Sequence, residues 1–259
     1  MTVINDAPPV PAQRSALAQL TRVEFRLFLR ERVGPIWGIG LPVLLLVIFG
    51  AIPAFKKVQP GYSGLTILDA YVPILITMSL ALLALIAMPS ALVSYRERGI
   101  LRRLKTTPAG PVRVLSAQLI VNLSVAVVTL VVLLVVARIA YGVPLPRQFG
   151  GWVVAALFAM AALMAIGLFV AAIGPTARAA AAIGAILFYP LMFFSGLWLP
   201  IPSMPVVLQH ISHASPLGAA WEAFASAGLG HWPPALSLVT MAAWAIVFGA
   251  AAARFFRWE

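Results

Sequence analysis

Few side chains in this sequence can attack a substrate or move a proton. The 259 residues include three histidines, seven acidic residues and no cysteine. The absence of cysteine excludes disulfides, thiol catalysis and haem attachment through thiols. No serine lies in a G-x-S-x-G turn, and no acidic cluster could hold magnesium for phosphoryl transfer. We therefore expect no catalytic residue in this chain. The alternative is an intramembrane protease or lipid transferase, which substitution of Ser195 and His210 would test.

Two histidines are the residues closest to a metal-binding pattern. His210 and His213 are three residues apart and could share one face of a helix. A zinc site needs a further ligand, and only Glu222 and His231 are near in sequence. We expect no metal site here, and place both histidines at the wet edge of a membrane segment.

The sequence also carries no nucleotide-binding loop. A G-x-x-x-x-G-K-[ST] pattern, whose backbone would hold the phosphates of ATP, is missing. The long apolar segments contain almost no ionisable side chain, so a carrier driven by protons or sodium is poorly supported. If this protein drives active transport, its energy must come from another polypeptide.

One basic stretch could receive that energy. Residues 94–110 read SYRERGILRRLKTTPAG. Ile100, Leu101 and Leu104 form a short apolar stripe, with arginines on the other faces, and Gly99 permits a tight bend before it. Amphipathic helices with apolar anchors and a charged rim commonly insert into grooves of partner proteins. We interpret the stretch as a helix that docks on a cytoplasmic motor; the alternative is a basic anchor at the membrane surface.

Composition identifies the elements that must position this stretch. Hydrophobic residues make up 62% of the chain and charged residues 10%, whereas soluble domains carry roughly 25% charged residues. Apolar runs long enough to cross about 30 Å of hydrocarbon recur, and they do not alternate as membrane β-strands do. Helices satisfy their own backbone hydrogen bonds in lipid. The sequence predicts an all-α integral membrane protein, a single transmembrane domain over residues 1–259.

We expect six transmembrane helices and three further segments. The predicted spans are residues 36–55, 65–93, 111–141, 151–173, 179–197 and 233–253. Residues 1–14 are expected to be a flexible tail, and residues 94–110 the docking loop. Residues 198–232 are interrupted by prolines and predict one or two short re-entrant helices on the outer side. Residues 15–33 predict an amphipathic helix on the membrane surface, with Arg22, Arg26 and Arg30 forming its basic stripe; packing of this helix on a partner is the alternative.

The distribution of basic residues predicts the topology. The net charge is +11, but the charges lie in short loops between apolar segments, so we expect membrane insertion and no nucleic-acid binding. With the N-terminus inside, the outer side carries only Lys56, Lys57, Arg138 and Arg147. The remaining loops and tails then carry the larger basic set on the cytoplasmic side, as the positive-inside rule requires. Both termini are therefore predicted to be cytoplasmic.

Three segments resemble the membrane subunits of the type-2 ABC exporter family. In the docking loop, Glu97, Arg98, Gly99, Ile100, Leu101 and Leu104, followed by Thr107 and Pro108, match the coupling-helix stretch of that family, with Ile100 in place of the more usual threonine or serine. The helix that ends at Gly34 and Pro35 resembles the elbow helix of the family.

The third resemblance follows the fifth predicted span. The matching residues are Phe194, Ser195, Gly196, Leu199, Pro200, Met204, Pro205, Leu208, Ile211, Ser212, Pro216 and Leu217. A basic residue that often ends this pattern in the family is not found.

The resemblance implies a mechanism and assigns residues to it. Two permease subunits, the same chain or a related one, would pair among membrane lipids, each docked on a cytoplasmic ABC ATPase subunit that binds ATP and magnesium; this chain itself would bind no cofactor. The implied docking residues are Glu97, Arg98, Gly99, Ile100, Leu101, Arg102 and Leu104. Substrate would pass near the second and fifth spans, which makes Met78, Leu82, Phe188, Met192 and Phe193 pathway candidates, with lipid-facing or core packing as the alternative. The implied outer gate contains Ser195, Gly196, Pro200, Pro205 and Pro216.

These observations favour a permease subunit of an ATP-driven exporter in the cytoplasmic membrane of a bacterium. The expected substrate is lipophilic: a drug, an antibiotic or a lipid-like molecule. Export of a lipid-linked glycan, and a membrane anchor that recruits a cytoplasmic partner without transport, are the alternatives.

Overall fold

The described part of the chain is built from helices. The structure is a computed structural model, and it describes residues 21–22, 25–26, 36–58, 66–100 and 110–255. In chain order the elements are η1 (Ile36–Gly40), α3 (Leu41–Ala51), η2 (Pro53–Lys56), α4 (Ile67–Ala81), η4 (Leu82–Ala87), α5 (Met88–Glu97), α7 (Gly110–Tyr141), α8 (Phe149–Ile173), α9 (Ala177–Phe194), η5 (Ile201–Ser203), α10 (Val206–Ala214), α11 (Pro216–Leu229) and α12 (Ala235–Phe255). Of these, η1 and η4 are π-helical, and η2 and η5 are 3-10 turns. These residues contain no strand, and their β pairing is an isolated bridge between Val58 and Thr66.

Five helices of the described chain are long and apolar enough to cross a membrane. They are Ile67–Glu97, Ser116–Tyr141, Phe149–Ile173, Ala177–Phe194 and Ala235–Phe255. The prediction of an all-α integral membrane protein is thereby confirmed. The predicted first span corresponds to a shorter apolar helix, Gly38–Ala51, which falls below the roughly 20 residues that a crossing needs. The count of six spans stays a prediction.

A proline ends this first helix earlier than its apolar run suggests. Ile52 adopts an extended backbone with φ −82° and ψ 119°, and Pro53 begins a 3-10 turn directly after it. Proline disfavours helical geometry in the residue before it. The apolar side chains continue to Phe55, but the helix does not, because hydrophobicity alone cannot carry it through Pro53.

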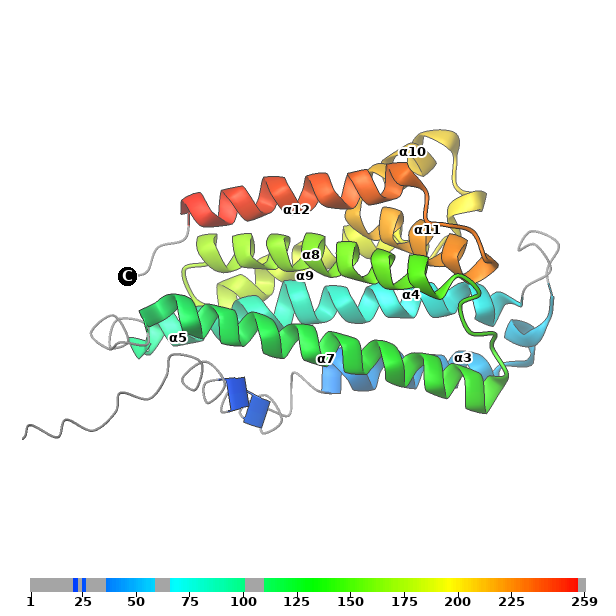
Figure 1. The fold of residues 1–259 in the computed structure, drawn as a ribbon, viewed down its shortest axis with the longest axis horizontal. Coiled ribbons are helices and arrows are strands. Elements are labelled where there is room, and N and C mark those ends of the chain that lie inside the picture. The colour runs from blue at the N-terminus through cyan, green and yellow to red at the C-terminus, as the bar shows by residue number, and fades with distance from the viewer. Residues whose placement is uncertain (1–20, 23–24, 27–35, 59–65, 101–109, 256–259) are drawn as a thin grey trace, which may run out of the picture.

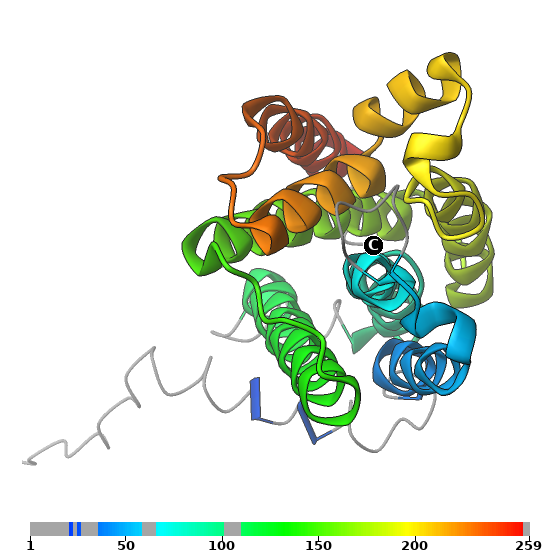
Figure 2. The same cartoon turned by 90° about the vertical axis from the view of Figure 1, so that its right-hand side faces the viewer.

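The helices form an elongated bundle around one long central helix. α4, η4 and α5 run on as one helix, which Figure 2 shows in end view between α3, α7, α8 and α9. α12 packs along α8, and α11 contacts both. Figure 1 shows that one end of the bundle holds the end of α5, the α8–α9 turn and the end of α12. We call this the Glu97 end; the opposite end, which holds α10 and the turn after α7, is the α10 end.

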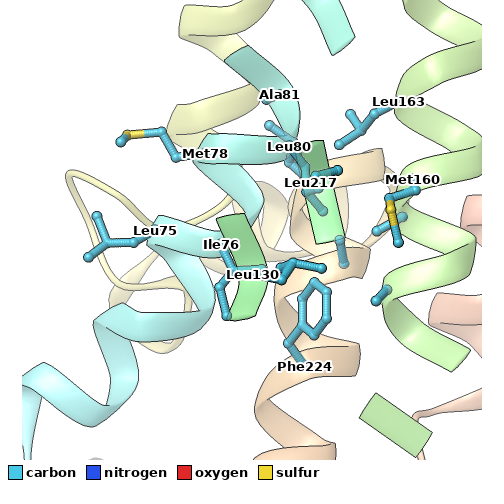
Figure 3. Packing of buried hydrophobic residues seen from close by; sticks show 14 of the residues in the cluster. Leu75, Ile76, Met78, Leu80, Ala81, Leu130, Met160, Leu163, Leu217 and Phe224 are labelled. Atoms are coloured by element: carbon cyan, nitrogen blue, oxygen red, sulfur yellow. The ribbon is translucent and has the colours of Figure 1, made fainter. Parts of the chain in front are cut away.

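The core lies between the central helix and its neighbours. Figure 3 shows Ile76 of α4, Leu130 of α7 and Phe224 of α11 meeting in the interior. Phe224 is fully buried. Burial of this core attaches α11 to the spanning helices, so α11 is an integral part of the bundle.

Candidate functional site

The Glu97 end presents the described part of the predicted docking loop. α5 ends at Glu97, and Glu97 and Arg98 are exposed. Gly99 has φ +68°, a left-handed conformation that glycine adopts without strain, and helical geometry resumes at Ile100. The predicted bend at Gly99 is therefore present. Leu101, Arg102 and Leu104 lie outside the described residues, as does Arg30; Arg22 and Arg26 are helical and exposed.

Arg96 holds this end of the bundle together. Its guanidinium donates hydrogen bonds to the carbonyl oxygens of Ala171, at 3.4 Å, and Gly174. Ala171 lies in the last turn of α8 and Gly174 caps its end, where backbone oxygens have no partner within the helix. Arg96 thus joins the docking loop to the α8–α9 turn. Sequence reasoning had counted this residue only as one positive charge among many.

The central helix contains a π-helical segment for a reason visible in its sequence. The Met88 N–H donates to the carbonyl of Leu83, five residues back, and therefore does not donate to the carbonyl of Ala84, four residues back. Residue 89 is proline, which has no N–H to offer to Leu85 or, in π-helical spacing, to Ala84. The carbonyls of Ala84 and Leu85 thus lose their usual donors.

Two glycines from neighbouring helices contact these two carbonyls. A Cβ built on Gly167 of α8 would lie 1.9 Å from the Ala84 oxygen, and one built on Gly184 of α9 would lie 1.9 Å from the Leu85 oxygen. Only glycine permits this approach, which brings Cα–H groups toward the two oxygens. The π segment with Gly167 and Gly184 is called the glycine grip below. It fixes the central helix to α8 and α9 near its middle.

The residues of the predicted substrate pathway lie inside the helical bundle. Met78, Leu82, Phe188 and Met192 are all buried and belong to one core cluster, whereas Phe193 is half-buried. Figure 3 places Met78 on the central helix, pointing away from Phe224. Their assignment as pathway residues stays a prediction.

The predicted outer-gate residues form the turn after α9 and the start of α11. The buried Ser195 hydroxyl donates to the Met192 carbonyl at 2.8 Å, and Gly196 turns the chain with φ +89°. Pro200 and Pro205 precede η5 and α10, whereas Pro216 is buried at the start of α11. Their assignment as a gate is also a prediction.

The α10 end contains a polar cluster that the sequence did not reveal. His213 Nδ1 lies 3.0 Å from Glu222 Oε2, and the Ser237 hydroxyl donates to the same oxygen at 2.7 Å. The cluster joins the three consecutive helices α10, α11 and α12. Glu222 had been considered only as a possible zinc ligand. The described residues contain no group of three or more His, Cys, Asp or Glu side chains that could hold a metal.

Comparison with known protein families identifies the family of this chain. The sequence model of the ABC-2 type transporter family matches residues 15–229, from the predicted surface helix to the end of α11. The chain belongs to the ABC-2 type transporter family. A search among curated proteins finds no match.

The family confirms the resemblance and fixes the coarse role of the chain. The ABC-2 membrane domain is the permease component of an ABC transporter and lacks an ATP-binding motif. ABC-2 permeases work with ABC ATPase partners as a general rule. In this ABC-2 permease, α12 lies outside the matched range but packs along α8 within it.

Proposed function

We propose that this ABC-2 permease is an exporter subunit that moves a lipophilic substrate out of the cell, driven by ATP hydrolysis on a separate ATPase. The observation that carries the proposal is the family match, which includes the docking loop and the segment after α9. These two segments lie at opposite ends of the bundle (Figure 1). A motor at one end and a gate at the other is the separation that this mechanism needs.

The charge distribution supports the proposed orientation. Arg96, Arg98, Arg178 and Arg254 belong to the Glu97 end. The chain that continues directly from α5 adds Arg102, Arg103 and Lys105. By the positive-inside rule, the Glu97 end faces the cytoplasm and its ATPase. Both chain termini then lie on the cytoplasmic side of a bacterial inner membrane.

The proposed energy path runs through the central helix. One end of this helix carries Glu97 and the docking loop, and the other end begins at Ile67, near the α10 end. Met78 and Leu82, two of the predicted pathway residues, lie on this helix between the two ends. Motion of the docking loop therefore has a continuous helical connection to the proposed pathway.

The docking claim is tested by co-purification with the candidate ATPase in lipid nanodiscs. We expect Leu101→Asp and Leu104→Asp to abolish the complex and the coupled ATP hydrolysis, because a charge on the apolar stripe opposes burial in a groove. Leu145→Asp, an exposed leucine at the α10 end, is the matched control and should retain both. Equal binding by all three variants would refute the docking helix.

Transport itself is tested in inside-out vesicles. Vesicles with the complete complex should accumulate a lipophilic fluorescent dye when ATP is added, and the Leu101→Asp complex should not. A complex that forms normally but shows no transport of lipophilic dyes and no substrate-stimulated hydrolysis would favour the membrane-anchor alternative.

A further inference from the structure

A cavity of about 200 Å³ lies near the α10 end, away from the predicted substrate pathway. Its walls come from the first turns of α4, the end of α7, the connection to α8, the start of α8, η5 and α11. None of the five pathway candidates lines it. The volume is below the ~300–1,000 Å³ of pockets for drug-sized molecules, so the cavity suits a small ligand or one end of a larger one.

Asp69 is the charged residue among the described residues that line this cavity. Its backbone N–H donates to Thr66 Oγ1 at 3.2 Å, and its Oδ2 accepts from the Thr66 N–H at 2.8 Å. This reciprocal cap fixes the carboxylate at the start of α4. A carboxylate has about four acceptor positions, and the cap uses one of them. Within the described chain, Asp69 forms no ion pair, so its negative charge lacks a partner.

Three aromatic side chains line the cavity among aliphatic and proline residues. Trp152 and Phe224 lie with ring centroids 5.2 Å apart, and both line the cavity together with Trp221. Aromatic faces attract cations, tryptophan most strongly.

We propose that this cavity binds a small amphipathic cation, with an ammonium group at Asp69 and an apolar body against Trp152, Trp221 and Phe224. A fixed carboxylate beside aromatic rings is the chemistry that recognises substituted ammonium ions. The cationic side chains of the α10 end, Lys56, Lys57, Arg138 and Arg147, do not line the cavity. The site is distinct from the proposed pathway, and binding to it does not require transport or the ATPase.

The same ammonium chemistry can come from two sources. It is present in the ethanolamine headgroup of a phospholipid and in soluble lipophilic amines. The cavity lies near the end of the bundle where, in the proposed orientation, the outer leaflet places its headgroups. The experiment must therefore separate the two sources.

Binding is measured with the permease alone, in nanodiscs of phosphatidylglycerol, a lipid without an ammonium group. The probe is benzyltrimethylammonium, and its neutral isostere is neopentylbenzene, with empty nanodiscs subtracted from each titration. We expect saturable binding of the cation and none of the isostere. Asp69→Asn should weaken the cation at least tenfold, although its amide oxygen can still accept from the Thr66 N–H and keep the cap.

Two further variants keep the test decisive. Glu222→Gln removes a carboxylate of α11 that does not line the cavity, and should leave binding unchanged. Ala225→Phe fills the cavity from α11 with Asp69 intact, and should abolish binding. Lack of saturable binding to the wild type, equal binding by Asp69→Asn, or equal binding of the isostere would overturn the proposal.

Added phosphatidylethanolamine identifies the natural source. Competition with the probe in wild-type protein would assign the site to the lipid headgroup. Lack of competition would assign it to a soluble amine, and either result supports a cation site. Because no ATPase is present, failure of the docking or transport experiments would leave this result unaffected.

Discussion

Single residues decide how closely the helices of this permease approach one another. Gly167 and Gly184 leave room for the carbonyls of Ala84 and Leu85, and Arg96 supplies hydrogen bonds to the end of α8. In each case a backbone oxygen that lacks its ordinary donor has a neighbour: a glycine, which has no side chain to block the approach, or the guanidinium of Arg96. Backbone groups of this kind are unfavourable in a membrane protein unless a neighbour satisfies them.

The glycine grip predicts a large effect of one methyl group. Gly167→Ala should lower the free energy of unfolding by about 1–3 kcal/mol, because the new Cβ cannot remain 1.9 Å from the Ala84 oxygen and the helices must separate. Thermal unfolding in detergent measures the change. Gly249→Ala is the control: its Cβ meets nothing within 4 Å, so the higher helix propensity of alanine should leave stability unchanged or raise it by up to about 1 kcal/mol. Equal effects of both substitutions would contradict the grip.

Arg96→Gln should loosen the Glu97 end without unfolding the bundle. The lost charged hydrogen bonds are worth about 1.5–3 kcal/mol, and they act on the last turn of α8. We expect faster hydrogen exchange in residues 171–176, measured by mass spectrometry. Arg98→Gln, a neighbouring exposed arginine, should leave this exchange unchanged. Unchanged exchange in Arg96→Gln would show that Arg96 does not hold the turn.

The sequence predicted the structural roles of some of these residues and not of others, for physical reasons. The bend at Gly99 was predictable because a glycine after a polar helix end is a local signal. The roles of Gly167 and Gly184 were not, because α8 and α9 contain many small residues and their sequences do not reveal which turn faces Pro89. The cluster of His213, Glu222 and Ser237 was also hidden, since it depends on how α10, α11 and α12 pack.

At the scale of elements, the helices after α9 are tied together by polar contacts. The buried Ser212 hydroxyl donates to the Phe194 carbonyl, and Ser215 caps α11 by accepting from the Gly218 N–H at 3.0 Å. Trp244 of α12 donates to the Ala214 carbonyl at 2.9 Å. α10 thus depends on contacts with α9, α11 and α12 for its position, since a helix this short is marginal alone.

Glu222→Ala should release α10 from this arrangement. The substitution removes the carboxylate that His213 and Ser237 share. A loss of about 1.4 kcal/mol raises the fraction of molecules in which α10 is open by about tenfold. We expect hydrogen exchange in residues 206–214 to increase by about tenfold. Ser226→Ala, on the same helix, should not alter it. A bundle in which exchange stays slow in Glu222→Ala would indicate that apolar packing alone holds α10.

For the whole molecule, composition predicted the class well and the first helix poorly. The apolar runs predicted an all-α membrane protein, because lipid leaves helices as the natural solution. The first predicted span differs because Pro53 ends the helix although apolar residues continue. The cavity beside Asp69 could not be predicted, since its walls come from six separate parts of the chain.

The absence of cysteine makes the orientation directly testable. Leu145→Cys, in the exposed turn at the α10 end, should react with a membrane-impermeant maleimide in intact cells. Arg178→Cys, at an exposed position in the first turn of α9, should react only in inside-out vesicles. The opposite pattern would place the Glu97 end outside and reverse the proposed topology.

The glycine grip has a mechanical consequence. The helix Ile67–Glu97 is held near its middle, with arms of roughly 25 Å toward Ile67 and 20 Å toward Glu97 at 1.5 Å per residue. A helix that moves as one body about such a point acts as a lever whose fulcrum is the pair of glycines. A sideways push at Glu97 would then swing Ile67, and Asp69 beside it, in the opposite direction by a similar amount. Spin labels at the two arms, measured against α8, would report displacements of opposite sign if the helix pivots and of equal sign if it slides.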